Sequence, residues 1–286
     1  MPVSSQAGRP SDPAGEARGP LIEQLFDMRS ADGVSWRSTV RVASVSARLF
    51  GGQLAAQGMA AAAGTVGPDL MPVSLHTVYL RPGDASVAPD YDVERVRDGR
   101  AFATRVVRAS QHGRELARMS TQWQRAETWQ EHDDGDESLP PIPPAPARLS
   151  YPAHGLLDGE LDLRWTESSP GRGLWFRYLG TVRDDPLRNA CISLYVGDLW
   201  LLDTLLRRHG QSYDSPALRA SSLDYAAWLH RLPDLRGWMY LGSTAPVSAG
   251  GRGFVQAVLR SEAGTRIATI NQEVSVRSRS VPDSSR

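Results

Sequence analysis

The sequence predicts an α+β fold in which one unit occurs twice, each time as an antiparallel sheet wrapped around a central helix. Three observations indicate this architecture. The chain divides into two halves of similar length, both halves end in similar pairs of β-like runs, and each half contains an apolar segment with the composition of a helix. A repeat of this kind has to be recognised before any single element is assigned, because it sets the whole architecture.

An acidic and proline-rich segment divides the chain near its middle. Residues 126–150 combine a cluster of acidic residues with repeated prolines, a composition typical of an extended linker. The linker separates residues 21–125 from residues 151–280, which we expect to be the two repeated units. Residues 1–20 are small, polar and rich in proline and glycine, so we expect a disordered tail there, and residues 281–286 form a second short tail.

Both halves end in a pattern typical of a β-hairpin. In the first half, GRAF at residues 99–102 leads into two β-like runs that meet at Gly113. In the second half, GRGF at residues 251–254 leads into two similar runs that meet at Gly264. A glycine between two such runs is a hairpin signal, so the same pair of strands is expected twice.

Further upstream, the halves share a strand pattern and a helical segment. SLHTVYLR at residues 74–81 is similar to SLDYAAWLHR at residues 222–231. The Ala-rich residues 51–63 correspond to the Leu-rich residues 197–210, which end at a glycine stop signal. Both segments are apolar on most faces, so we expect each helix to be buried. A buried helix wrapped by an antiparallel sheet is the hotdog arrangement, and two of them in one chain make a double hotdog.

Composition narrows the classes of partner and location. Lys plus Arg equals Asp plus Glu, at 32 each, so net charge gives no support to a nucleic-acid partner. The chain has one cysteine, Cys191, which favours a reducing compartment. The N-terminal residues lack the apolar core of a secretory signal, and no apolar run is long enough to span a membrane, so we expect no membrane insertion. A bacterial cytoplasmic protein is expected, because the Ala, Arg and Gly content suggests a GC-rich bacterial genome.

The ordered motifs of the chain resemble those of one enzyme family. The first half reads FGGQ at residues 50–53, SLHTVYLRPG at 74–83 and RDGRAF at 97–102. The second half continues with DDPLRNACISLYVGDL, SLDYAAWLHR, GGRGF and INQEVSVR. Each motif is weak by itself, but the series covers most of the chain in one order. It resembles the type II acyl-CoA thioesterases, double-hotdog enzymes of bacteria and peroxisomes.

The resemblance implies an activity and a site. The expected reaction is the hydrolysis of fatty acyl-CoA to a free carboxylic acid and CoA. In the family, three side chains hold the hydrolytic water, and the matching positions are Asp198 in GDLW, Ser222 in SSLDY and Gln272 in INQE. The family pattern places the Asp at the opening of the second-half helix.

The chain departs from the family pattern at four positions near these motifs. The family's usual Ser before the Asp is Gly197, its usual His after Ser-Leu-Asp is Tyr225, a usual aromatic residue is Leu229, and a common His is Val73. These changes bear on the shape of the pocket and on the preferred acyl chain.

The three side chains suit the hydrolysis of a thioester. Asp198 can accept a proton from water, while Ser222 and Gln272 can donate and accept hydrogen bonds. We expect the oxyanion to be met by backbone N–H groups at the start of the first-half helix, near Gly51, Gly52 and Gln53, where the macrodipole is positive. The equivalent polar positions of the first half lack a carboxylate, so one active centre is expected.

Ordinary structural roles remain open for each residue. Asp198 could cap its helix, Ser222 could be a strand-end hydroxyl, and Gln272 could face solvent. His76, His209 and His230 show no metal-ligand spacing, so neither a metal nor another cofactor is expected beyond the CoA of the substrate. Arginines at turns are candidates to meet the CoA phosphates, although such residues are commonly solvated: Arg81, Arg97, Arg100 and Arg252.

Two other functions remain open from sequence. One is a hotdog protein that binds acyl groups or CoA, or tailors a product in a specialised pathway, without hydrolysis. The other is a hotdog enoyl-CoA hydratase, which ranks last because the His of that pattern is missing after Asp198. Exposed edge strands favour pairing between subunits, so a homo-oligomer is expected.

Overall fold

The computed structural model describes residues 21–38, 48–134, 138–145, 160–167, 171–180, 184–212, 215 and 217–278. Both expected tails lie outside the described residues, as do residues 151–159 at the expected start of the second half. The described residues of the expected linker, 126–134 and 138–145, belong to no helix or strand.

The described part of the chain folds into four helices and thirteen strands. The helices are α1 (Leu21–Gln24), α2 (Gly51–Ala63), α3 (Pro186–Asp198) and α4 (Leu201–Arg208). The strands before the linker are β1 (Met28–Ser30), β2 (Ser35–Ser38), β3 (Leu70–Tyr79), β4 (Asp90–Asp98), β5 (Phe102–Gln111) and β6 (Arg114–Arg125). Those after it are β7 (Leu161–Glu167), β8 (Arg172–Tyr178), β9 (Leu218–Ser222), β10 (Asp224–Leu229), β11 (Met239–Ala249), β12 (Arg252–Ser261) and β13 (Arg266–Ser278).

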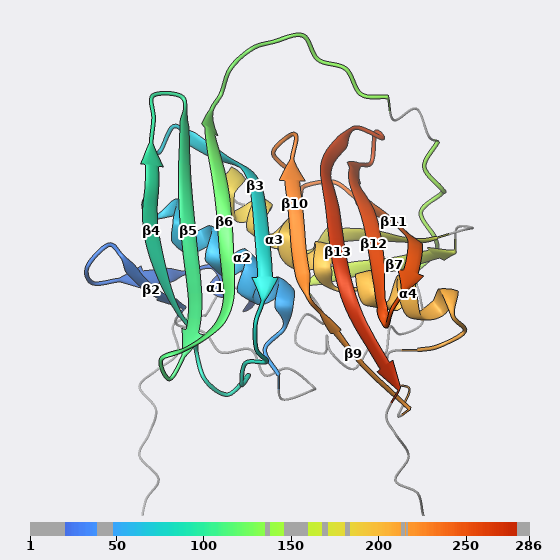
Figure 1. The fold of residues 1–286 in the computed structure, drawn as a ribbon. Helices are drawn as coiled ribbons and strands as arrows, with labels where there is room; N and C mark the ends of the chain where they lie inside the picture. The colour runs from blue at the N-terminus through green and yellow to red at the C-terminus, as the bar shows by residue number, and fades with distance from the viewer. Residues whose placement is uncertain are drawn as a thin grey trace, which may run out of the picture.

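All strands join one antiparallel sheet, in the order β1-β2-β4-β5-β6-β3-β10-β13-β12-β11-β8-β7, with β9 paired to β13. The two halves meet where β3 pairs with β10, in front of α2 and α3 (Figure 1). The register at this seam pairs His76 with Ala226, Thr77 with Tyr225, and Val78 with Asp224. In the repeat, His76 corresponds to Asp224 and Val78 corresponds to Ala226. A two-fold rotation that exchanges the halves therefore exchanges the first and last of these pairs. The axis of the repeat therefore passes between Thr77 and Tyr225.

The expected hairpins are confirmed. β5 pairs with β6, and β12 pairs with β13, each through a turn that contains the expected glycine. Gly113 has φ 72° and Gly264 has φ 88°, in the left-handed region that favours glycine. Each half thus contains one hotdog unit, with α2 packed on β3 to β6 in the first half and α4 packed on β11 and β12 in the second. Together the two units make the expected double hotdog.

One helix boundary was predicted wrongly. Residues 197–210 do not form a single helix that opens at Asp198, because α3 ends at Asp198 and α4 begins at Leu201. The helix α3 starts upstream, where Asp185 accepts a hydrogen bond from the backbone N–H of Arg188 at 3.0 Å and Pro186 follows as the first helical residue. The additional helix α3 packs against α2.

Small side chains let α2 lie deep in the molecule. Ala55 and Ala56 are fully buried, and the helix is anchored at its C-terminal end by the buried side chain of Arg105. Arg105 donates from Nε to Thr65 Oγ1 at 2.8 Å and from Nη2 to the Thr65 carbonyl at 2.9 Å, and it forms an ion pair with Asp98. These contacts hold the segment that directly follows α2, while α2 itself packs along α3. No helix among the described residues is long and apolar enough to span a membrane.

Candidate active site

Asp198 lies at the junction of the two halves. It is the last residue of α3 and is only 6% exposed. Its carboxylate accepts hydrogen bonds from Gln272 Nε2 on β13 and from the backbone N–H of Gly52 on α2. Three elements from both halves therefore hold this carboxylate.

The carboxylate of Asp198 takes the place of a capping residue for α2. The N-cap of α2 is Phe50, which makes no side-chain cap, and the first turn of α2 contains no acidic residue. The first N–H groups of a helix lack partners within the helix and carry the positive end of its dipole. Asp198 therefore caps a helix other than its own, since Asp185 caps α3.

Burial sets the acidity of Asp198. Removal from water raises its pKa from 3.8 to about 7, although the hydrogen bonds from Gln272 and Gly52 lower it in part. A carboxylate with this pKa is partly ionised at neutral pH and can still accept a proton there. That property suits a general base.

The structure brings Gln272 to Asp198 and places Ser222 on the same face of the sheet. Gln272 is 1% exposed, and its Oε1 has no hydrogen-bond partner among the described residues. Ser222 pairs with Val274 on β13, two residues beyond Gln272, so their side chains share one face. Within the described part of the chain, no hydrogen bond joins Ser222 to Asp198 or Gln272, and Ser222 is partly exposed.

Gly51 and Gly52 lie directly against Asp198. A Cβ on Gly51 would lie 3.1 Å from Asp198 Oδ2, and a Cβ on Gly52 would lie 2.8 Å from Asp198 Cβ. Glycine at both positions is therefore needed for the close approach of α2 to α3. The side chain of Gln53 is directed elsewhere, because its Nε2 donates to Gln57 Oε1 at 3.4 Å inside the first half.

Sequence reasoning missed the role of the tyrosines around Asp198. Burial and the nearby Asp198 carboxylate raise the pKa values of Tyr79, Tyr195 and Tyr225, so all three hydroxyls stay protonated. Tyr225 Oη donates to the carbonyl of Leu194 on α3 at 3.0 Å, one turn before Asp198. The sequence signal for this contact was the departure from the family pattern at Tyr225.

Comparison with known proteins identifies the family. A model described as the acyl-CoA thioesterase C-terminal domain matches residues 128–276, and one described as the N-terminal domain matches residues 40–124. The chain belongs to the type II acyl-CoA thioesterase family. The predicted resemblance is thereby confirmed.

Individual relatives of this thioesterase family cover almost the whole chain. Acyl-coenzyme A thioesterase 8 of Mus musculus is 27% identical over 93% of this chain and 92% of its own length. Acyl-CoA thioesterase 2 of Haemophilus influenzae is 27% identical over 80% of this chain and 88% of its own. The solved structure of the acyl-CoA thioesterase II TesB2 of Mycobacterium marinum has a TM-score of 0.79 and 30% identity, covering 91% of this chain and 99% of that one.

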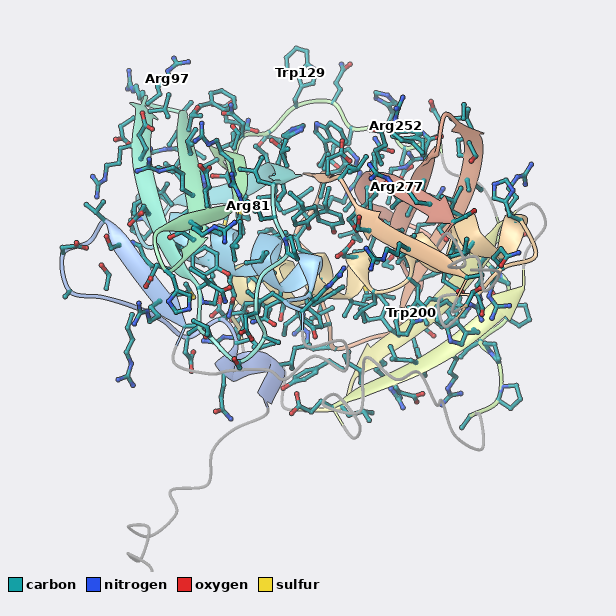
Figure 2. All side chains as sticks on the ribbon, turned by 60° about the horizontal axis from the view of Figure 1, so that its bottom comes forward. Arg81, Arg97, Trp129, Trp200, Arg252 and Arg277 are labelled. Carbon is teal, nitrogen blue, oxygen red and sulfur yellow. The ribbon has the colours of Figure 1, made fainter. Side chains whose placement is uncertain are left out.

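Several other residues do not join this candidate site. Two of the candidate arginines do not converge, since Arg97 and Arg252 lie in opposite halves of the molecule (Figure 2). Trp200 is buried and packs edge-to-face on Trp165, with ring centroids 4.5 Å apart. Cys191 is buried, which raises its pKa to about 12 and leaves it a poor nucleophile. Among the described residues, no group of His, Cys, Asp and Glu is placed to hold a metal ion.

Proposed function

We propose that this chain hydrolyses acyl-CoA thioesters with a water molecule held by Asp198, Gln272 and Ser222. The family membership supplies the reaction, and the observation that carries the assignment is the bond between the Gln272 amide and the buried Asp198 carboxylate. Burial brings the pKa of that carboxylate to about 7, where a base works at neutral pH. The same two residues argue against a purely binding role, which would not require an activated carboxylate.

The reaction follows from the hydrogen-bond capacities of these groups. Ionised Asp198 accepts one proton of the water, and Gln272 Oε1, which has no partner among the described residues, accepts a hydrogen bond from the other. The water oxygen bonds to the thioester carbonyl carbon and forms a tetrahedral intermediate. The C–S bond then breaks, the proton held by Asp198 passes to the CoA sulfur, and the acid is released. Ser222, on the same face of the sheet, makes a further hydrogen bond to the water and so fixes its orientation.

The start of α2 is the proposed oxyanion-binding element. The positive end of the helix dipole meets the site at Gly51 and Gly52, where the absence of side chains lets Asp198 approach the backbone closely. In the structure the N–H of Gly52 is bonded to Asp198. The oxyanion therefore needs donors besides Gly52, and the N–H groups of Gly51 and Gln53 are the neighbouring candidates.

We further propose that the substrates are fatty acyl-CoAs, that the protein works without a metal or a separate cofactor, and that it acts in the bacterial cytoplasm as a homo-oligomer. The sheet supports the last point, because its two ends, β1 and β7, each pair on one side only among the described strands. An unpaired strand edge is a template for pairing with another chain.

The function is tested by measuring thiol release from short-, medium- and long-chain acyl-CoAs with the wild type and Asp198→Asn. We expect turnover by the wild type and a loss of about 10²–10⁴-fold in kcat in the variant, as for removal of a general base. Circular dichroism and the melting temperature establish that both proteins are folded. Folded wild-type protein that releases no thiol from any acyl-CoA would refute hydrolysis and leave a binding role.

A further inference from the structure

The hydroxyl of Tyr79 lies at the proposed site without a role in the reaction described above. We propose that Tyr79 Oη donates a hydrogen bond to the thioester carbonyl oxygen and stabilises the negative charge that develops on it. This inference rests on the proposed function and names a catalytic residue that the family resemblance did not supply.

Tyr79 is held at the site by its backbone and its strand position. It is the last residue of β3, and its backbone N–H donates to the carbonyl of Leu223 at 2.9 Å, next to Ser222. Along β3, the side chains of Thr77 and Tyr79 point to the same face, and Thr77 pairs with Tyr225 at the repeat axis. The tyrosine therefore faces the same interior as Asp198.

Its hydroxyl and the carboxylate flank the same glycine. A Cβ on Gly51 would lie 2.9 Å from Tyr79 Oη and 3.1 Å from Asp198 Oδ2. The distance between the two oxygens therefore cannot exceed the sum of these two distances. Both groups therefore pack closely against Gly51, which has no side chain to keep them apart. A thioester bound at the start of α2 would therefore have the carboxylate and the hydroxyl beside the same residue.

The hydroxyl is free to act as a donor. Tyr79 Oη is buried and has no hydrogen-bond partner among the described residues. A buried hydroxyl without a partner lowers stability, and phenylalanine would fill the same space without that penalty. Burial, and then the Asp198 carboxylate, raise the pKa of Tyr79 well above its usual value, so the group keeps its proton throughout the neutral range.

The site also needs such a donor. Asp198 occupies the N–H of Gly52, which removes one of the backbone donors expected for the oxyanion. A neutral hydroxyl can replace the Gly52 N–H as a donor to the oxyanion. It stabilises the negative charge on the oxygen and carries no charge that would change the ionisation of Asp198.

The first test is the kinetics of Tyr79→Phe, which keeps the ring and removes only the hydroxyl. We expect kcat to fall about 10²-fold, the effect of losing one oxyanion donor, with KM changed less than about threefold. The pH at which activity declines on the acid side should not move, because Asp198 still sets it. Tyr240→Phe is the matched control, since Tyr240 is a buried tyrosine of β11 outside the site, and its kcat should stay within twofold of the wild type.

The second test reads the carbonyl directly. The stretching frequency of a ¹³C-labelled thioester carbonyl is measured by infrared difference spectroscopy on acyl-CoA bound to Asp198→Asn and to Asp198→Asn/Tyr79→Phe. Loss of a hydrogen bond from Tyr79 should move the band to higher frequency in the double variant. An unmoved band, or a kcat of Tyr79→Phe within twofold of the wild type, would overturn this inference.

The two proposals fail in different ways. Full activity in Asp198→Asn refutes the water-activating carboxylate whatever Tyr79 does. A collapse in Asp198→Asn, together with an unchanged Tyr79→Phe, leaves the hydrolytic mechanism standing and refutes only the role of the tyrosine.

Discussion

The hydroxyl of Tyr225 occupies the space that a side chain at Gly197 would need. A Cβ on Gly197 would lie 2.8 Å from Tyr225 Oη and 2.7 Å from Ile270 Cδ1, both closer than real Cβ contacts come. The family pattern has Ser and His at these two positions, so two departures in this chain explain each other. Tyr225, together with Ile270, leaves no room for a side chain at 197, and the Tyr225 hydroxyl donates to the Leu194 carbonyl one turn before Asp198.

This relationship predicts that the two positions are coupled. Gly197→Ser alone should lower the melting temperature and reduce kcat at least tenfold, because the new side chain displaces Tyr225 or the end of α3. Adding Tyr225→His should recover much of both losses, with a coupling energy of about 1–2 kcal/mol in a double-mutant cycle. Urea unfolding and steady-state kinetics on the four proteins measure it. Strictly additive effects would contradict the compensation.

The acidity of Asp198 predicts how activity depends on pH. Its pKa of about 7 means that the base is protonated and inactive below neutral pH. We expect kcat to rise about tenfold per pH unit up to pH ~7 and then to level off. A wild-type profile that stays flat from pH 5 to 8 would exclude a base with this pKa.

The same burial predicts a change in stability. Because the folded pKa of about 7 exceeds the value of 3.8, the folded state binds this proton more tightly than the unfolded chain does. The resulting stability is fully present below pH 3.8 and is lost as pH rises through about 7. Asp198→Asn avoids this loss, so its free energy of unfolding should exceed that of the wild type by about 4 kcal/mol at pH 8. Equal urea midpoints for the two proteins at pH 8 would argue against a carboxylate whose pKa is raised by burial.

Gln272 is expected to tune Asp198 as well as to bind the water. Its amide bond favours the ionised carboxylate, so Gln272→Leu should raise the pKa of Asp198 and shift the acid limb of the kcat profile to higher pH. We also expect kcat at the plateau to fall about 10²-fold. Asn271→Leu, on the opposite face of β13, is the control and should leave the acid limb in place. An unchanged limb in Gln272→Leu would mean that the bond to Asp198 has no electrostatic role.

The sequence was sufficient to predict the repeat, the hairpins and the family, because these depend on local patterns. Gly113 and Gly264 mark turns that need positive φ. The strands β3 and β10, whose sequences are similar, pair in a register that is symmetric about Thr77 and Tyr225. The end of α3 at Asp198 could not be predicted in the same way. GDLWLLDTLL reads as one apolar helix, and the break at Trp200 depends on packing against the rest of the fold.

The candidate site shows the same division. Asp198, Ser222 and Gln272 were predicted by matching motifs, and nothing in the sequence around Asp198 indicated that it would cap α2. The proposed role of Tyr79 was not predicted, since a tyrosine in an apolar strand is typical of core packing. Its position became informative only when the fold placed β3 beside the start of α2. The contact between Tyr225 and Gly197 likewise joins residues that are distant in sequence.

The source of the oxygen in the product tests the central claim most directly. A single turnover is run in H₂¹⁸O with enzyme in excess over acyl-CoA, and the released acid and the peptide that contains Asp198 are analysed by mass spectrometry. Attack by a water held at Asp198 predicts one ¹⁸O atom in the acid and none in the peptide. Unlabelled acid with ¹⁸O in the Asp198 carboxylate would show that Asp198 attacks the thioester itself, and would contradict the account given above.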